Sequence, residues 1–142
     1  MDLVGISLKI ARRLPVLNKM MRMINRVVLS CDIPPETDIH ESVFFAHHGL
    51  GVVVNKNSSI GKNTRILQNV TIGGTGKTRV YKGKEIIAPI IGENVKINSG
   101  VQIIGPIVVG DNAVIGAGSI VVDDVPPSSV VVGQKAGVIK YL

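Results

Sequence analysis

The stretch from Ile91 to Ser119, read as IGENVK-INSGVQ-IIGPIV-VGDNAV-IGAGS, repeats a unit of six residues that opens on a large aliphatic side chain. The same spacing continues on both sides of this stretch. The unit-opening residues are Ile33, Ile39, Phe45, Val54, Ile60, Ile66, Ile72, Ile91, Ile97, Ile103, Val109, Ile115 and Val121. Asn, Asp and Gly recur inside the units, and these residues suit tight turns because they tolerate left-handed backbone or bond their own main chain. A six-residue repeat of short strands and tight turns predicts a β-helix.

The repeat loses its phase first between Phe45 and Val54, which are nine residues apart instead of six. This interval holds two adjacent histidines, His47 and His48. A regular pattern that is broken locally usually places a functional side chain or a loop there. His48 is therefore the first candidate for chemistry.

The second loss of phase lies at residues 73–90, which begin with Gly-Gly-Thr-Gly-Lys. Insertions in a solenoid leave it as loops, often on the binding face. The segment lacks the full spacing of a phosphate-binding loop, so a nucleoside triphosphate site is not expected. Two interpretations remain open: the basic loop receives phosphates of another ligand, or it is simply solvated.

Composition restricts the function further. Hydrophobic residues make up 45% of the chain but aromatic residues only 3%, so the core is expected to consist of Val, Ile and Leu. The shortage of aromatic side chains for base stacking argues against nucleic-acid binding. Cys31 is the only cysteine, which excludes an intrachain disulfide and favours a buried thiol in a cytoplasmic protein.

Residues 1–30 are expected to form a basic amphipathic helical segment, broken at Pro15. The segment carries six of the sixteen cations against one acid, Asp2. Two partners are consistent with this pattern. The segment packs on its own protein or on a sister subunit with its cations solvated, or it contacts the inner face of a membrane peripherally through residues 1–29. No apolar run is long enough for a membrane span.

Residues 31–142 are expected to form the second part, a β-helix domain with the loop at 73–90. Pro126 and Pro127 end the repeat, because proline cannot continue a strand ladder. Residues 123–142 are then a C-terminal tail that covers the open end of the solenoid.

Linked motifs give a more specific interpretation. They are Asp32-Ile33-x-Pro35, His48-x-x-Gly51-Val52-Val53, Leu67-Gln68-Asn69-Val70-Thr71-Ile72-Gly73-Gly74-Thr75-Gly76-Lys77, and Ile115-Gly116-Ala117-Gly118-Ser119 followed by Asp124-Val125-Pro126-Pro127. With these motifs the chain resembles the hexapeptide-repeat acyltransferases over residues 32–140. Within them it is similar to the serine acetyltransferases and their capsule and exopolysaccharide O-acetyltransferase relatives. The resemblance implies an all-β fold, a left-handed parallel β-helix, and a homotrimer. The short N-terminal helical segment of this chain stands in place of the large helical domain of the serine acetyltransferases.

The resemblance also implies an acetyl-CoA-dependent O-acetyltransferase without a metal. It assigns His48 as the general base and Asp32 as the carboxylate that orients it. A neutral imidazole suits this role, because it accepts a proton near neutral pH. The positions that correspond to acetyl-CoA contacts in the family are Gly74, Thr75, Ser99, Ala117, Gly118 and Lys135.

Two departures from the serine acetyltransferases bear on the acceptor. His47 stands where they have Asp, and Ile87-Ala88 where they have Arg-His, and these are residues that the family uses to hold the amino acid. We therefore predict a hydroxyl of a sugar or surface-polysaccharide precursor as the acceptor, with free serine a poor substrate. The alternatives are serine O-acetylation for cysteine biosynthesis and a non-catalytic trimeric scaffold.

Overall fold

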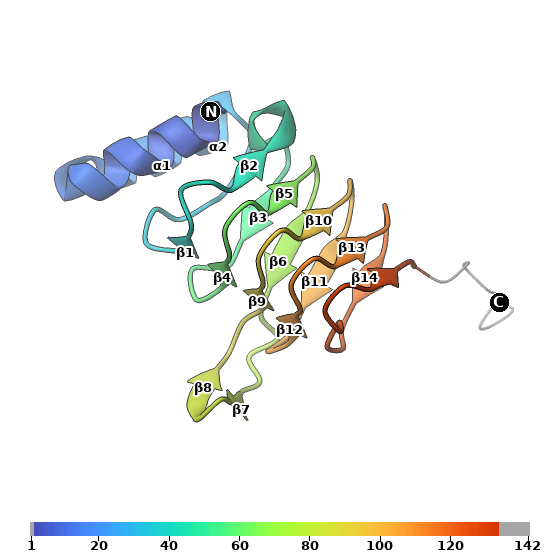
Figure 1. Ribbon diagram of the computed structural model, residues 1–142. Helices are drawn as coiled ribbons and strands as arrows, with labels where there is room; N and C mark the ends of the chain where they lie inside the picture. Colours follow the sequence, from blue (N-terminus) through green and yellow to red (C-terminus); the bar gives the residue numbers. More distant parts are fainter. Residues whose placement is uncertain (1, 134–142) are drawn as a thin grey trace, which may run out of the picture.

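The computed structural model describes residues 2–133, and the expected tail contact Lys135 lies outside them. Short parallel strands form three sheets around one core, with two helices at the N-terminal end and a hairpin that projects outward from the middle coils, between residues 73 and 90 (Figure 1). The first sheet has the order β1-β4-β9-β12, with bounds Asp38–Ile39, Ser59–Ile60, Ile90–Ile91 and Val108–Val109. The second has the order β15-β13-β10-β5-β2, with bounds Val130–Val131, Val114–Ile115, Lys96–Ile97, Arg65–Ile66 and Phe44–Phe45. The third has the order β14-β11-β6-β3, with bounds Ile120–Val121, Gln102–Ile104, Thr71–Gly73 and Val53–Val54.

Strand pairing confirms the hexad register. Ile97 of β10 pairs with Ile115 of β13, three units further along the chain. One turn of the helix is therefore three hexads, and each unit contributes one strand to each face. The second residue of each two-residue strand points inward, so the unit-opening side chains stack into columns. In the second sheet this column contains Phe45, Ile66, Ile97 and Ile115, all at most 1% exposed.

An asparagine ladder marks one corner of the β-helix. Asn63, Asn94 and Asn112 all have positive φ, the left-handed conformation expected for turn residues. Their side-chain amides also bond along the stack, from Asn63 to Asn94 at 3.2 Å and from Asn94 to Asn112 at 3.3 Å. The corner therefore combines a turn preference with polar contacts between successive coils.

Helix α1 spans Leu3–Arg13, a short 3-10 turn η1 spans Pro15–Leu17, and α2 spans Asn18–Val28. The break predicted at Pro15 is confirmed. Asp2 caps α1 by accepting a hydrogen bond from the Gly5 amide, and its other oxygen accepts one from the Phe45 amide. The cap therefore also ties α1 to β2.

Most cations of the helix pair have partners within the protein. Arg12 donates to the carbonyls of three residues of the first coil, Pro35, Thr37 and Ile39. Lys9 lies 3.7 Å from Glu41. Arg22 and Arg26 both bind Asp32. Most of the cationic side chains that could have contacted an anionic membrane therefore hold the helices on the β-helix instead.

The outward side of the helix pair is apolar instead. Its exposed large side chains are Leu3, Ile6, Ile10, Leu14, Val16, Met20, Met23, Ile24, Val27 and Val28. Within residues 2–133, neither helix is long and apolar enough to cross a membrane.

Candidate active site

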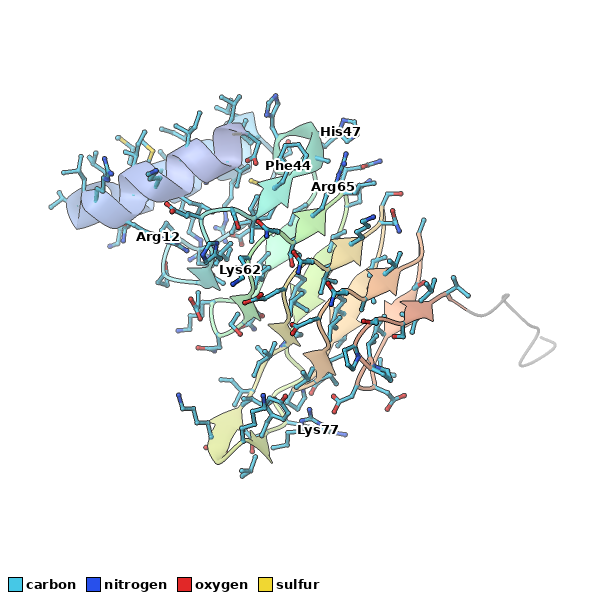
Figure 2. The ribbon with its side chains drawn as sticks, in the orientation of Figure 1. Arg12, Phe44, His47, Lys62, Arg65 and Lys77 are labelled. Carbon is cyan, nitrogen blue, oxygen red and sulfur yellow. The ribbon has the colours of Figure 1, made fainter. Side chains whose placement is uncertain are left out.

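The phase break at residues 46–49 forms a tight turn, η2 (Ala46–Gly49), between β2 and β3. His47 and His48 have φ of 52° and 55°, in the left-handed region that non-glycine residues seldom adopt. Both side chains are exposed. Strained backbone that presents exposed imidazoles is a feature found at functional sites. Figure 2 shows His47 at the same end of the β-helix as Phe44 and Arg65, which pair across β2 and β5.

Two glycines allow the turn to fit against its surroundings. A Cβ at Gly49 would lie 3.0 Å from Val4 Cγ2 of α1 and 3.7 Å from Cys31 Cβ. A Cβ at Gly51 would lie 2.0 Å from Asn69 Oδ1, and φ there is +69°. The Gly51 amide donates to the Ser30 carbonyl at 2.8 Å. The two glycines therefore pack closely against α1, the preceding coil and the following coil, while the histidine side chains stay exposed.

His48 contacts the N-terminal end of α1. The Leu3 amide donates to His48 Nδ1 at 3.4 Å, a long hydrogen bond. In this geometry the lone pair of a neutral imidazole lies on Nδ1 and the proton on Nε2. Proton acceptance at Nε2 requires the other tautomer.

Asp32 bonds to two arginines of α2. Arg22 Nε donates to Oδ1 at 3.0 Å, and Arg26 Nη2 donates to Oδ2. These contacts hold the pKa of the Asp32 carboxyl below its ordinary value, and the hydrogen bond from Arg26 has the largest effect. Partial burial acts on this pKa in the opposite direction. The hydrogen bond expected between Asp32 and His48 is not present among the described residues, because the guanidinium groups occupy the carboxylate. Sequence reasoning missed these arginines, since it considered the cations of α2 only as a membrane-facing or solvated set.

Cys31, the residue before Asp32, is a buried thiol. Burial raises its pKa to about 11, and the negative charges of Asp32 and Asp2 add to the effect. A thiol with this pKa is not a nucleophile near neutral pH. The structural role expected for Cys31 is consistent with this environment.

One corner of the β-helix connects the histidine turn with three of the six expected coenzyme positions. Down this corner the Asn69 amide donates to the Leu50 carbonyl at 2.8 Å, and the Gly100 amide to the Gln68 carbonyl at 3.0 Å. The Gly118 amide donates to the Ser99 carbonyl at 2.9 Å. Ser99, Ala117 and Gly118 therefore continue the edge that begins at the histidine turn, and a Cβ on Gly118 would meet open space.

The remaining expected positions, Gly74 and Thr75, follow β6 and open the loop. A Cβ at Gly74 would lie 2.7 Å from the Ile87 carbonyl oxygen, so the two ends of the insertion touch there. The loop itself contains an antiparallel hairpin that the sequence analysis did not predict, β7 (Arg79–Tyr81) and β8 (Lys84–Ile86). The turn of this hairpin is Lys82-Gly83, and both residues have positive φ. The glycine was the available sequence signal, because two-residue hairpin turns favour glycine at such positions.

The hairpin is tied to the last coil. Arg79 Nη2 donates to both carboxylate oxygens of Asp124 at 2.8 and 2.9 Å, and Asp124 Oδ1 also accepts from the Val108 amide. Tyr81 and Lys82 line a cleft of about 460 Å³ against β9 and β12. Residues 2–133 contain no cluster of three or more His, Cys, Asp or Glu residues suited to a metal.

The comparisons with known proteins agree with the hexad architecture. A family model described as bacterial transferase hexapeptide (six repeats) matches residues 88–123. A serine acetyltransferase of Synechococcus elongatus is 37% identical over 128 residues, which are 90% of this chain and 50% of that relative. One of Helicobacter pylori is 36% identical over 125 residues, which are 88% of this chain and 70% of that relative.

Solved structures lead to the same group. The Neisseria gonorrhoeae serine acetyltransferase in complex with serine has a TM-score of 0.75 and 34% identity, and the match covers 94% of this chain and 54% of that one. A serine acetyltransferase in complex with CoA has a TM-score of 0.74 and 31% identity, covering 96% and 54%. The fold is thus the expected left-handed parallel β-helix of a hexapeptide-repeat acyltransferase.

More narrowly, the chain belongs to the serine acetyltransferase family. It spans about half the length of several of the curated relatives that it matches.

These matches correct the predicted acceptor. The main prediction, a sugar or surface-polysaccharide hydroxyl, is wrong, because the relatives and the structural neighbours are serine acetyltransferases. The matches likewise do not support a specific place in the capsule and exopolysaccharide branch. The prediction rested on the charged groups missing at two matched positions, residues 47 and 87–88.

Proposed function

We propose that this chain transfers the acetyl group of acetyl-CoA to the hydroxyl of serine. The observation that carries the proposal is the similarity to the Helicobacter pylori serine acetyltransferase over 88% of this chain and 70% of that enzyme. The structural neighbours solved with serine and with CoA support both substrates.

We propose His48 as the general base of this reaction, in the tautomer that carries its proton on Nδ1 and accepts at Nε2, with the long contact from the Leu3 amide given up. It removes the hydroxyl proton of serine as the oxygen attacks the thioester carbonyl, and it returns that proton to the departing thiolate of coenzyme A. A new ester C–O bond forms and the C–S bond breaks. The corner that runs from the histidine turn to Ser99, Ala117 and Gly118 provides an edge along which the pantetheine arm lies. Gly74 and Thr75 are its proposed contacts at the loop.

Acceptor preference tests the function directly. We expect coenzyme A release from acetyl-CoA with L-serine at a kcat/KM at least about 10-fold above that for homoserine, glucose and a nucleotide sugar, since an extra methylene alone changes selectivity by about 10–200-fold. The release is followed with a thiol reagent on the full chain. Absence of release with serine contradicts the proposal, and faster release with a sugar contradicts the choice of acceptor.

We propose that the protein is a homotrimer. The third sheet presents the outward-facing apolar side chains of Val53 and Ile120, and Val122 follows its last strand; they are 44%, 65% and 56% exposed in the single chain. Exposed apolar patches of this kind mark interaction sites. Sedimentation equilibrium at micromolar concentration is expected to give three times the chain mass of 15.1 kDa. A stable monomer contradicts the trimer.

We propose, finally, that the apolar side of the helix pair contacts a membrane surface. Residues 3–28 contain no acidic side chain, and Arg13 and Lys19 are exposed beside the apolar residues. Vesicles with anionic lipid are expected to co-sediment the protein, and Met23→Gln with Val27→Gln is expected to reduce the bound fraction. Equal binding of this double variant and the parent protein contradicts the contact.

A further inference from the structure

A serine acceptor presents two charges in addition to its reactive hydroxyl. Its carboxylate and its ammonium group each lose hydration on binding, and this loss is compensated only where each charge meets an opposite one. The site therefore needs a cation and an acid next to each other, close to the base. The following inference rests on the proposed function and concerns the groups that meet these charges.

Arg22, Arg26 and Asp32 form such a set, here called the α2 ion triad. Arg22 uses Nε and Nη2, at 3.0 and 3.4 Å from the two oxygens of Asp32, and Arg26 uses Nη2 alone. Two guanidinium groups around one carboxylate leave one net positive charge. A guanidinium has five N–H donors, so Arg26 in particular keeps donors for a further acceptor.

The triad is accessible from solvent. The side chains of Arg22, Arg26 and Asp32 are 38%, 53% and 26% exposed. Asp32 is also held ionised, because both arginines lower its pKa. An ionised carboxylate with part of its surface free is able to accept a hydrogen bond from an ammonium group.

The triad also lies beside the histidine turn. The Asp32 amide donates to the Val52 carbonyl, and the Val54 amide donates to the Asp32 carbonyl, both at 2.9 Å. Asp32 is thus the neighbour, one coil away, of the strand that leaves the turn carrying His48. Gly49 of the turn also packs against Cys31, the residue before Asp32. Figure 1 shows the N-terminal end of the helix pair next to this part of the β-helix.

We propose that Arg22 and Arg26 bind the carboxylate of the amino-acid acceptor, while Asp32, fixed between them, accepts a hydrogen bond from its ammonium group. The alternating charges of the triad match those of a zwitterion. Bidentate arginine–carboxylate pairs add geometric selectivity to charge, which suits a site that distinguishes an α-amino acid from a neutral alcohol. The N-terminal helix is then part of the acceptor site, and the charges absent from the histidine turn and from residues 87–88 come from α2.

The test compares Arg22→Gln and Arg26→Gln with a matched control, Arg13→Gln, on the other helix. With the full chain, we expect the KM for L-serine to rise about 10–100-fold in the two triad variants, as for loss of one partner of a charged pair. The KM for acetyl-CoA is expected to stay within about 2-fold. The KM for serinamide, which lacks the carboxylate, is expected to change little in the two triad variants. Their preference for serine over serinamide is therefore expected to fall.

A purely structural triad predicts a different pattern. The two triad variants would then lower the unfolding temperature, and the KM for serine at permissive temperature would match that of Arg13→Gln. This result overturns the inference. Arg26→Lys guards against a variant that fails to fold, because it keeps the charge and loses the planar fork. It is expected to lie between the parent protein and Arg26→Gln in its KM for serine, and a KM equal to that of the parent contradicts the proposal.

Calorimetric titration with L-serine separates this inference from the proposed function. Serine binding that weakens in both triad variants supports the inference even where no coenzyme A is released, an outcome that contradicts only the proposed function. Turnover of serine with an unchanged KM in both variants contradicts only the inference. No heat of binding with the parent protein at millimolar serine contradicts the inference.

Discussion

His48→Ala is expected to lower kcat for acetyl transfer by about 10²–10⁴-fold, the range typical for loss of a general base. The imidazole is exposed on the turn η2, so its removal deletes proton transfer and creates no cavity in the core. The KM for acetyl-CoA is expected to change little, because the proposed coenzyme contacts lie further along the corner. Steady-state kinetics with serine and acetyl-CoA measure both quantities.

His47→Ala is the matched control for this substitution. Its imidazole is also exposed and its backbone has nearly the same φ, so the two variants change the turn equally. We expect His47→Ala to retain kcat within a few-fold of the parent protein. A large loss in His47→Ala together with near-normal turnover in His48→Ala would assign the base to the other histidine.

The fold could be predicted because each six-residue unit separately indicates the same short strand and the same corner. The unit-opening residues specify an inward position, and the Asn and Gly residues specify a corner, as the left-handed Asn63, Asn94 and Asn112 show. Such local preferences agree along the chain, so no long-range contact had to be guessed. The hairpin at residues 79–86 was missed because it leaves the repeat and its pairing is not encoded by the six-residue period.

The surroundings of the candidate site were harder to predict, because they depend on contacts across distant parts of the sequence. His48 was selected from the phase break, yet its hydrogen bond comes from Leu3, 45 residues earlier. Asp32 was selected from a motif, yet its partners are Arg22 and Arg26 on a separate helix. Charge counting along residues 1–30 gave the correct number of cations, but only packing shows which of them face the β-helix.

Ile97→Ala is expected to lower the free energy of unfolding by about 2–5 kcal/mol, the range for removing a large aliphatic side chain from a packed core. Ile97 is fully buried in β10, between Ile66 of β5 and Ile115 of β13. Three successive coils therefore line the cavity that the substitution leaves. Since each coil of a solenoid packs only on its neighbours, no distant element moves in to fill the space.

Lys96→Ala is the control, because Lys96 belongs to the same strand and its side chain is exposed on the outer face. Its effect on the free energy of unfolding is expected to stay within about 0.5 kcal/mol. Urea unfolding of both variants, followed by circular dichroism, measures the difference. Equal stability of the two variants would mean that the inward column does not carry the core. The cavity lies three coils from Asp32 and two coils from β2, the strand that precedes the histidine turn. Folded Ile97→Ala is therefore expected to keep the KM of the parent protein for serine. A loss of stability without a change in KM would therefore separate the residues that hold the β-helix together from the residues that bind the acceptor.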